Sequence, residues 1–119
     1  MNTKTPECYT TDTQARCLRV QMTATRWLVL PLDQFVFADL DSDGKEQKLK
    51  LVFATHEILV SGHGLQRIET AVWRLELSGL MKLPEKYHSL IPESQPKIRE
   101  IVVTEMKPTA TPQSETSLN

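Results

Sequence analysis

Residues 35–53 read FVFADLDSDGKEQKLKLVF and carry the clearest structural signal of the chain. A mostly apolar run precedes the pair Asp43-Gly44. After the pair, apolar residues recur at every second position: Leu49, Leu51 and Phe53. Asp and Gly both tolerate a positive φ, so this pair between two strand-like runs predicts a β-hairpin. We therefore expect an antiparallel sheet built around residues 35–53.

Further strand-like segments lie on both sides of this hairpin. Residues 18–22 alternate apolar and polar side chains, and 27–30 form a short apolar run that ends at Pro31. After the hairpin, 58–61 and 98–103 are rich in β-branched and other apolar residues. The period of two and the β-branched side chains favour strands at these places. Together the segments predict an antiparallel, twisted sheet of five to six strands.

Residues 65–77 are predicted to form the main helix. Apolar side chains recur there at spacings of three, four and three: Leu65, Ile68, Val72 and Leu75. This pattern is typical of one face of an amphipathic helix, and Ser78-Gly79 is a suitable place for the helix to end. Every second residue over 71–77 is also apolar, so a strand there remains an alternative. We prefer the helix because its pattern spans more residues, and we expect it to pack on one face of the sheet.

The two ends of the chain differ in composition from the middle. Residues 1–14 and 107–119 are rich in threonine and other polar residues, contain proline, and offer little to bury. Such segments do not recover the entropy lost on ordering, so we expect both to be disordered tails. Residues 15–106 are then expected to fold as a single α+β domain around one hydrophobic core.

The composition argues against several classes of protein. Fourteen basic and fifteen acidic residues give a net charge of -1, which supplies no field to attract nucleic acid or an anionic membrane. The first residues lack the apolar core of a signal peptide, and the uninterrupted apolar runs are too short to span a membrane. With only Cys8 and Cys17, no disulfide framework is expected. We therefore expect a cytoplasmic protein without nucleic-acid or membrane partners.

Residues 39–44, with the sequence DLDSDG, resemble the first half of a calcium-binding loop. Calcium prefers several carboxylate oxygens, and Asp39, Asp41 and Asp43 alternate around a turn that contains a glycine. An EF-hand loop ends with a glutamate at its twelfth position, which is Lys50 here, and it lies between helices rather than strands. We favour a solvated hairpin turn and keep a divalent-cation site as the first alternative.

Residues 62–64, with the sequence GHG, lie between an expected strand and the expected helix. A dinucleotide-binding loop has this position and a third glycine, but Arg67 occupies the place of that glycine. A helix N-terminus preceded by Gly62 and Gly64, with Arg67 nearby, is still able to hold an anion. We favour a tight turn made by the glycines and name these three residues as anion-binding candidates.

The sequence carries no complete catalytic or metal-binding motif. His56-Glu57 begins a zinc-protease motif, but Val60 replaces the second histidine. Ser61 lies two residues before His63, without a nucleophile elbow around it. We therefore expect no cofactor and no catalytic residue. The second alternative is an enzyme whose site is assembled from residues scattered along the chain.

The outer side of the expected helix carries large apolar side chains that packing on a sheet does not require. On a helix, Trp73 and Leu77 lie one turn apart and nearly opposite the core-facing residues. Tryptophan is common at the energetic centres of interfaces because it removes a large apolar area from water. The alternative is that a loop over 80–91 covers this stripe. The leading prediction is a non-enzymatic binding or assembly module. Its Trp73 and Leu77 are expected to contact another protein, most simply a second copy of the chain across a two-fold axis.

Overall fold

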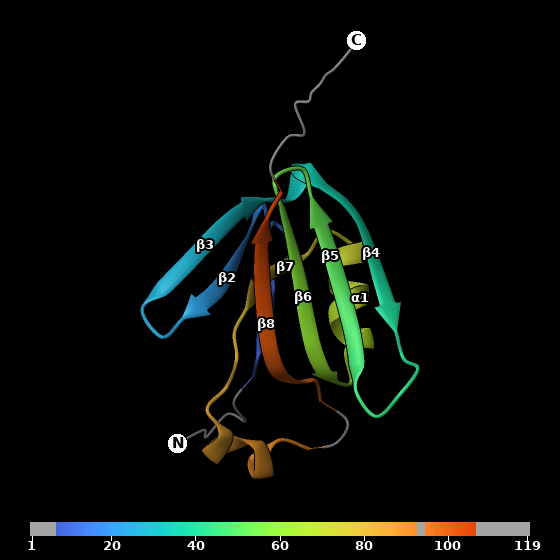
Figure 1. Cartoon of the computed structure of the whole chain (residues 1–119). Helices are drawn as coiled ribbons and strands as arrows, with labels where there is room; N and C mark the ends of the chain where they lie inside the picture. Colours follow the sequence, from blue (N-terminus) through green and yellow to red (C-terminus); the bar gives the residue numbers. More distant parts are fainter. Residues whose placement is uncertain (1–6, 93–94, 107–119) are drawn as a thin grey trace.

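The protein combines two β-sheets with one α-helix (Figure 1). The structure is a computed structural model that describes residues 7–92 and 95–106. Within these ranges, sheet A has four strands in the order β1-β7-β2-β3, and sheet B has four strands in the order β4-β5-β6-β8. The predicted α+β class is confirmed, whereas two four-stranded sheets replace the single sheet of five to six strands.

Sheet B is built on the predicted hairpin. Its strands are β4 (Phe35–Asp41), β5 (Gln47–Phe53), β6 (His56–His63) and β8 (Lys97–Glu105), and each runs antiparallel to its neighbours. The turn between β4 and β5 contains Gly44 at φ 112°, a backbone conformation that other residues rarely adopt. The Asp-Gly pair therefore reverses the chain here, as the sequence predicts.

The register of sheet B sends every second side chain to the same inner face. Leu51 of β5 pairs with Ala38 of β4 and with Ile58 of β6, and Ile58 pairs with Val103 of β8. Side chains of directly paired residues share one face of a sheet. The largest side chains of this inner face are completely buried: Leu49, Leu51, Phe53, Ile58 and Val60.

Sheet A combines the N-terminal strands with a strand from the middle of the chain. Its members are β1 (Tyr9–Thr11), β2 (Cys17–Thr23), β3 (Arg26–Pro31) and β7 (Leu77–Leu80). Strands β2 and β3 form an antiparallel hairpin, while β7 runs parallel to β2 and antiparallel to β1. A 3-10 segment, η2 (Glu85–Leu90), lies between β7 and β8.

The two sheets separate at Pro31. Proline has no backbone N–H for a strand ladder, and the 3-10 turn η1 (Leu32–Gln34) follows it directly. Leu32 is buried, so this turn packs into the core while the chain passes from β3 to β4. Apolar patterns along the sequence identify strands but do not show which strands pair, which is why one continuous sheet was expected.

The helix α1 (Gln66–Trp73) lies behind sheet B in the view of Figure 1 and contacts β4 and β7. Its apolar face is buried as the periodicity predicts, with Leu65, Ile68 and Val72 completely inaccessible. The helix ends at Trp73, however, and the chain continues as strand β7 from Leu77. The prediction of a helix over 65–77 is thus correct for residues 66–73. The alternative prediction of a strand is correct for Leu77.

The core fills the space between sheet B on one side and sheet A with α1 on the other. Sheet A contributes Leu18, Val20 and Leu30 to the same buried cluster as the inner face of sheet B. Among the described residues, no helix is long and apolar enough to cross a membrane.

The fold includes residues that precede residue 15, where the sequence predicts the start of the domain. Cys8 is almost completely buried, its Sγ donates a hydrogen bond to the Pro96 carbonyl (3.4 Å), and its own carbonyl accepts from the Met81 amide (2.8 Å). Strand β1 then pairs with β7. Of the tails expected at residues 1–14 and 107–119, residues 1–6 and 107–119 lie outside the described residues.

A chain that starts at Asp12 should be less stable than one that starts at Glu7, because it lacks β1 and the buried Cys8 side chain. Burial of one medium-sized apolar side chain contributes about 1.5–3 kcal/mol. Each kcal/mol corresponds to roughly 4–8 °C in Tm for a domain of this size. Circular dichroism should therefore show a Tm lower by about 10 °C, and equal Tm values would show that β1 is dispensable.

Stability should also decrease in alkaline solution through Cys8. Burial raises the pKa of its thiol from 9.0 to about 11. Between these pH values the unfolded chain loses the proton and the folded chain keeps it, so the free energy of unfolding falls, by roughly 3 kcal/mol at most. Chemical denaturation at pH 8, 9, 10 and about 11 measures this. Cys8→Ala keeps the other titrating groups and should have a shallower decline, whereas an identical decline would contradict the assignment.

Candidate functional site

The turn that ends α1 has an unusual residue in its key position. The Leu75 amide donates to the Val72 carbonyl (2.9 Å), and the Glu76 amide donates to the Ala71 carbonyl (2.8 Å). These two bonds form a Schellman motif, which requires a left-handed residue between helix and following chain. Leu75 occupies that position at φ 58°, where glycine is usual. A side chain there costs about 1 kcal/mol relative to glycine.

Two large apolar side chains at this turn are exposed to solvent. Trp73 is 77% exposed and Leu75 is 47% exposed, and they lie two residues apart around the end of α1. Leu77, by contrast, is completely buried in β7. Trp73 and Leu77 therefore do not form the helical stripe that the sequence analysis proposed, because the helix stops before Leu77. The exposed apolar side chains at this turn are those of Trp73 and Leu75.

A groove lies beside this turn, between the outer face of α1 and strand β1. It has a volume of about 450 Å³, and its lining includes Tyr9, Thr11, Arg67, Thr70, Arg74 and Glu76. Arg67 and Thr70 share one face of α1, and Arg74, directly after the helix, continues that face at a spacing of four. Arg67 is among the anion-binding candidates predicted from the sequence and Arg74 is not, although the helical spacing between the two residues is visible in the sequence.

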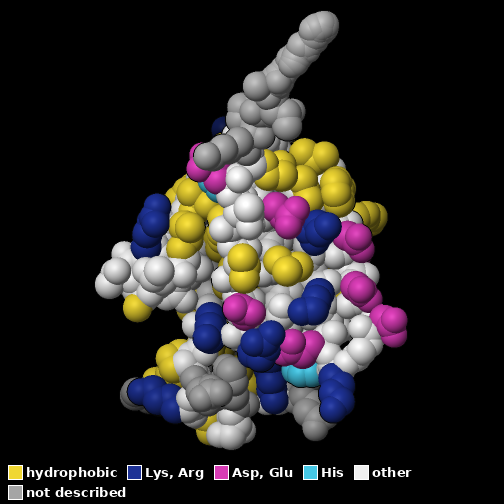
Figure 2. Space-filling model, viewed as in Figure 1, with side chains coloured by type: hydrophobic (Ala, Val, Ile, Leu, Met, Phe, Trp, Pro, Cys, Tyr) yellow, Lys and Arg dark blue, Asp and Glu magenta, His cyan; other side chains and the backbone are white. Residues whose placement is uncertain are grey.

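The acidic turn distributes its carboxylates differently from a calcium loop. In the β4–β5 ladder Asp39 pairs with Lys50 and Asp41 pairs with Lys48, so these opposite charges face each other on the outer side of sheet B. Figure 2 shows acidic and basic side chains interspersed over this side. The Asp41 carboxylate also accepts a hydrogen bond from the Asp43 amide (2.9 Å). Among the described residues, no three metal-ligating side chains form a group suited to a metal ion.

The glycines before α1 have a packing role. A Cβ on Gly62 would lie 1.9 Å from the Lys97 carbonyl oxygen, so only glycine permits the close approach of β6 to β8. Gly64 has φ 67°, a conformation that glycine adopts at low cost. The Leu65 amide, at the start of the helix, already donates to the Gln47 side-chain oxygen (2.7 Å). Arg67 is exposed and lines the groove beside α1, rather than joining the glycines in one site.

The histidines considered for catalysis are not brought together. His56 and His63 lie at opposite ends of β6, and seven residues of strand span about 23 Å. His56 Nδ1 is within hydrogen-bond distance of Thr55 Oγ1 (2.7 Å). Ser61 is buried on the same strand. The structure therefore places His56 and Glu57 in one region and His63 in another.

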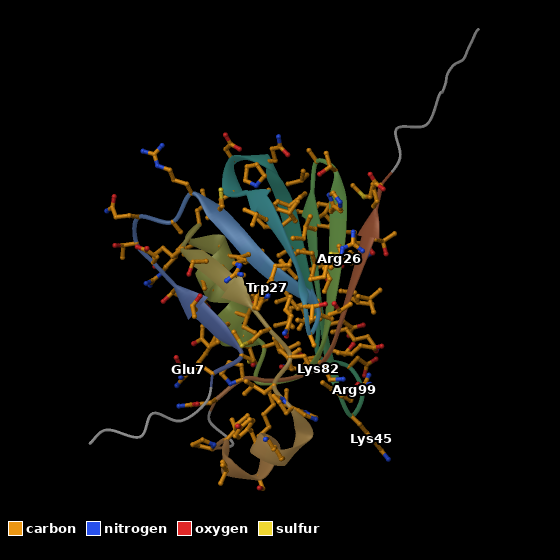
Figure 3. The ribbon with its side chains drawn as sticks, turned by 90° about the vertical axis from the view of Figure 1, so that its left-hand side faces the viewer. Glu7, Arg26, Trp27, Lys45, Lys82 and Arg99 are labelled. Atoms are coloured by element: carbon orange, nitrogen blue, oxygen red, sulfur yellow. The ribbon has the colours of Figure 1, made fainter. Side chains whose placement is uncertain are left out.

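The strongest described ion pair joins the β4–β5 turn to β8. The Arg99 guanidinium holds the Glu46 carboxylate through two bonds, one from Nε and one from Nη2 (3.0 Å). This hydrogen bonding lowers the pKa of Glu46 and raises the pKa of Arg99. Arg99 is exposed and Glu46 is partly buried, so solvent screens the pair, and it fixes the turn more than it stabilises the fold. Figure 3 shows Arg99 near the turn that carries Lys45.

A second hollow, which no sequence pattern indicates, lies between the end of β2 and the segment that follows β7. It has a volume of about 460 Å³ and is lined by residues that include Gln21, Met22, Met81, Lys82 and Ile101. The Lys82 amide donates to the Gln21 side-chain oxygen (3.3 Å), which ties the two segments together. Nearby on sheet A, the Arg19 guanidinium lies 4.1 Å from the centre of the Trp27 ring. The Arg19 side chain is therefore already bound to another residue of the chain through a cation–π contact.

Calcium should leave the stability of the protein unchanged, because lysines across the ladder already face the carboxylates of Asp39 and Asp41. Adding calcium or a chelator should therefore shift Tm by less than about 1 °C. Gly44→Ala should lower stability by about 1 kcal/mol, since alanine disfavours a positive φ. A chelator-sensitive Tm that Asp41→Asn abolishes would instead establish a cation site at residues 39–44.

No protein-family model, no curated protein and no solved structure matches the chain in the three comparisons with known proteins.

Proposed function

We propose that the protein is a non-enzymatic binding and assembly module that self-associates through the turn at the end of α1. The observation that carries this proposal is the exposure of Trp73 and Leu75 at a turn where glycine would be more stable. An exposed tryptophan is the residue type most enriched at the energetic centres of interfaces. A residue held in an unfavourable backbone region is a reason to infer a function for its side chain.

The apolar area that Trp73 can remove from water predicts how strongly two copies of the chain associate. Covering the exposed part of one tryptophan removes roughly 150 Å² from water, equivalent to about 4 kcal/mol at ~25 cal/mol per Å². Two copies of Trp73 would together contribute about 8 kcal/mol, which is similar to the estimated cost of association, about 4–15 kcal/mol. Leu75 adds further apolar area on each side. The expected complex is therefore weak, with Kd in the micromolar range or above.

A second copy of the same chain is the simplest partner. In a two-fold symmetric dimer the same surface is used by both subunits, so Trp73 of one copy meets the turn of the other without requiring any further patch. Because Leu77 lies in the core, it takes no part in this contact. The proposal therefore replaces the expected pair of Trp73 and Leu77 with Trp73 and Leu75.

Substitutions of Leu75 and Trp73 should have different effects on folding and on self-association. Leu75→Gly should raise the free energy of unfolding by about 0.5–1 kcal/mol, because glycine adopts the left-handed conformation without steric cost. The same substitution should weaken self-association, measured by sedimentation velocity over a wide protein concentration range. Trp73→Gln should raise the dimer Kd at least tenfold while Tm stays within a few degrees, because the side chain is exposed in the monomer.

A matched control removes an exposed apolar side chain elsewhere. Val29 is 55% exposed on β3, and Val29→Thr keeps its shape while reducing its apolar character. This variant should self-associate like the unmodified chain. A chain that remains monomeric up to about millimolar concentration, or an unchanged Kd in Trp73→Gln, would contradict the proposal.

A further inference from the structure

The groove between α1 and β1 has the size of a small-molecule site. Its volume of about 450 Å³ lies within the range of about 300–1,000 Å³ that is usual for such sites and is far larger than a bare ion needs. Strand β1 supplies Tyr9 and Thr11 to one wall, and α1 supplies the other. Ala71 also lines the groove, and its small side chain leaves room next to the helix.

The polar groups that line this groove are mostly hydrogen-bond donors. Arg67 and Arg74 contribute two guanidinium groups, and Tyr9, Thr11 and Thr70 contribute hydroxyls. Glu76 is the one carboxylate of the lining, so positive charge exceeds negative charge by one. Seven residues of helix separate the two arginines by a rise of about 10.5 Å, with Thr70 between them on the same face. An arginine side chain is long enough for a single oxyanion in the groove to lie within reach of both residues.

Neither arginine side chain forms an ion pair or a hydrogen bond within the described part of the chain. The described ion pairs belong to Arg99, which binds Glu46 and Glu100, and Arg19 is stacked on Trp27. Arg67 and Arg74 form no ion pair and no side-chain hydrogen bond with any other residue that the structure describes. Each guanidinium therefore keeps the planar set of donors that binds a carboxylate or phosphate group through two parallel bonds.

We propose that this groove binds a small organic anion that carries a carboxylate or a phosphate group. The oxyanion is held by Arg67 and Arg74, with the Thr70 hydroxyl between them. The carbon part of the ligand lies against the Tyr9 ring and Ala71. Self-association is not required for this site, because its lining contains neither Trp73 nor Leu75.

The groove gives variants with opposite expected effects. Arg67→Gln and Arg74→Gln keep a long polar side chain and remove the charge, and each should weaken binding about tenfold. Glu76→Gln removes the opposing carboxylate and should strengthen binding about twofold or more. A control with the same change of charge is Arg26→Gln, since Arg26 is exposed at the start of β3 and outside the groove (Figure 3).

The test is a titration of the full-length, isotope-labelled protein monitored by NMR. Phenyl phosphate and benzoate should each produce saturable shifts at the backbone amides of Thr70, Arg74 and Thr11, and phenol should produce none. Tighter binding of one anion identifies the source of the oxyanion as phosphate or carboxylate. Higher salt should weaken both, because partly exposed charges are screened.

Three results would overturn the proposal. The first is the absence of saturable shifts with either anion. The second is equal binding of phenol, which would show that charge takes no part. The third is equal weakening in Arg26→Gln and Arg67→Gln, which would show only a general effect of net charge. Because the substituted arginines are exposed, Tm should remain within a few degrees in all variants, so loss of binding is separable from loss of folding.

Discussion

The register of the β4–β5 hairpin determines which side chains of sheet B are buried. With Leu51 opposite Ala38, the odd-numbered residues of β5 point into the core and Lys48 and Lys50 point to solvent. A shift of one residue would reverse these faces, placing two lysines in the core and three large apolar side chains in water. The cost of burying the charged lysines alone exceeds the net stability of a domain of this size. Strand β6 pairs with β5, and β8 pairs with β6, so the same register determines which of their side chains face the core.

The reversal after α1 is the second constraint on the fold, because it directs β7 into sheet A. The helix runs along the inner side of sheet B, and β7 must reach the position between β1 and β2. The Schellman motif turns the chain within a few residues, which requires Leu75 in the left-handed region. Glycine would form the same turn at lower cost. The turn therefore explains the path of the backbone, but it does not explain why its central residue is an exposed leucine next to an exposed tryptophan.

Features of the fold that depend on local sequence were predictable, and features that depend on distant contacts were not. The Asp43-Gly44 turn and the buried face of α1 at Ile68 and Val72 follow from patterns within a few residues. Strand β1 was missed because its partner β7 lies about seventy residues away, and three polar residues carry little pattern of their own. Leu75 was assigned to the core because the spacing of apolar residues along the sequence does not reveal a left-handed turn.

The same distinction applies to the candidate sites. The exposure of Trp73 follows from its position on the helical wheel, and the structure places it there. Leu77 was paired with it only because the helix was extended by one turn too many. The groove beside α1 needs β1 for one of its walls, so no pattern within 65–77 reveals it. Arg74 could be recognised as a partner of Arg67 only once both were known to border the same hollow.

The helix α1 separates the residues that hold the fold together from those assigned to binding. Eight residues are too few for a stable isolated helix, and no side chain caps its N-terminus. Its position therefore depends on the inner side, where Ile68 and Val72 are completely buried. The outer side carries Arg67, Arg74 and Trp73, all exposed, and contributes little to that packing. Substitutions on the outer side should change binding while the helix stays in place, whereas Ile68→Ala should lower the free energy of unfolding by about 2–5 kcal/mol.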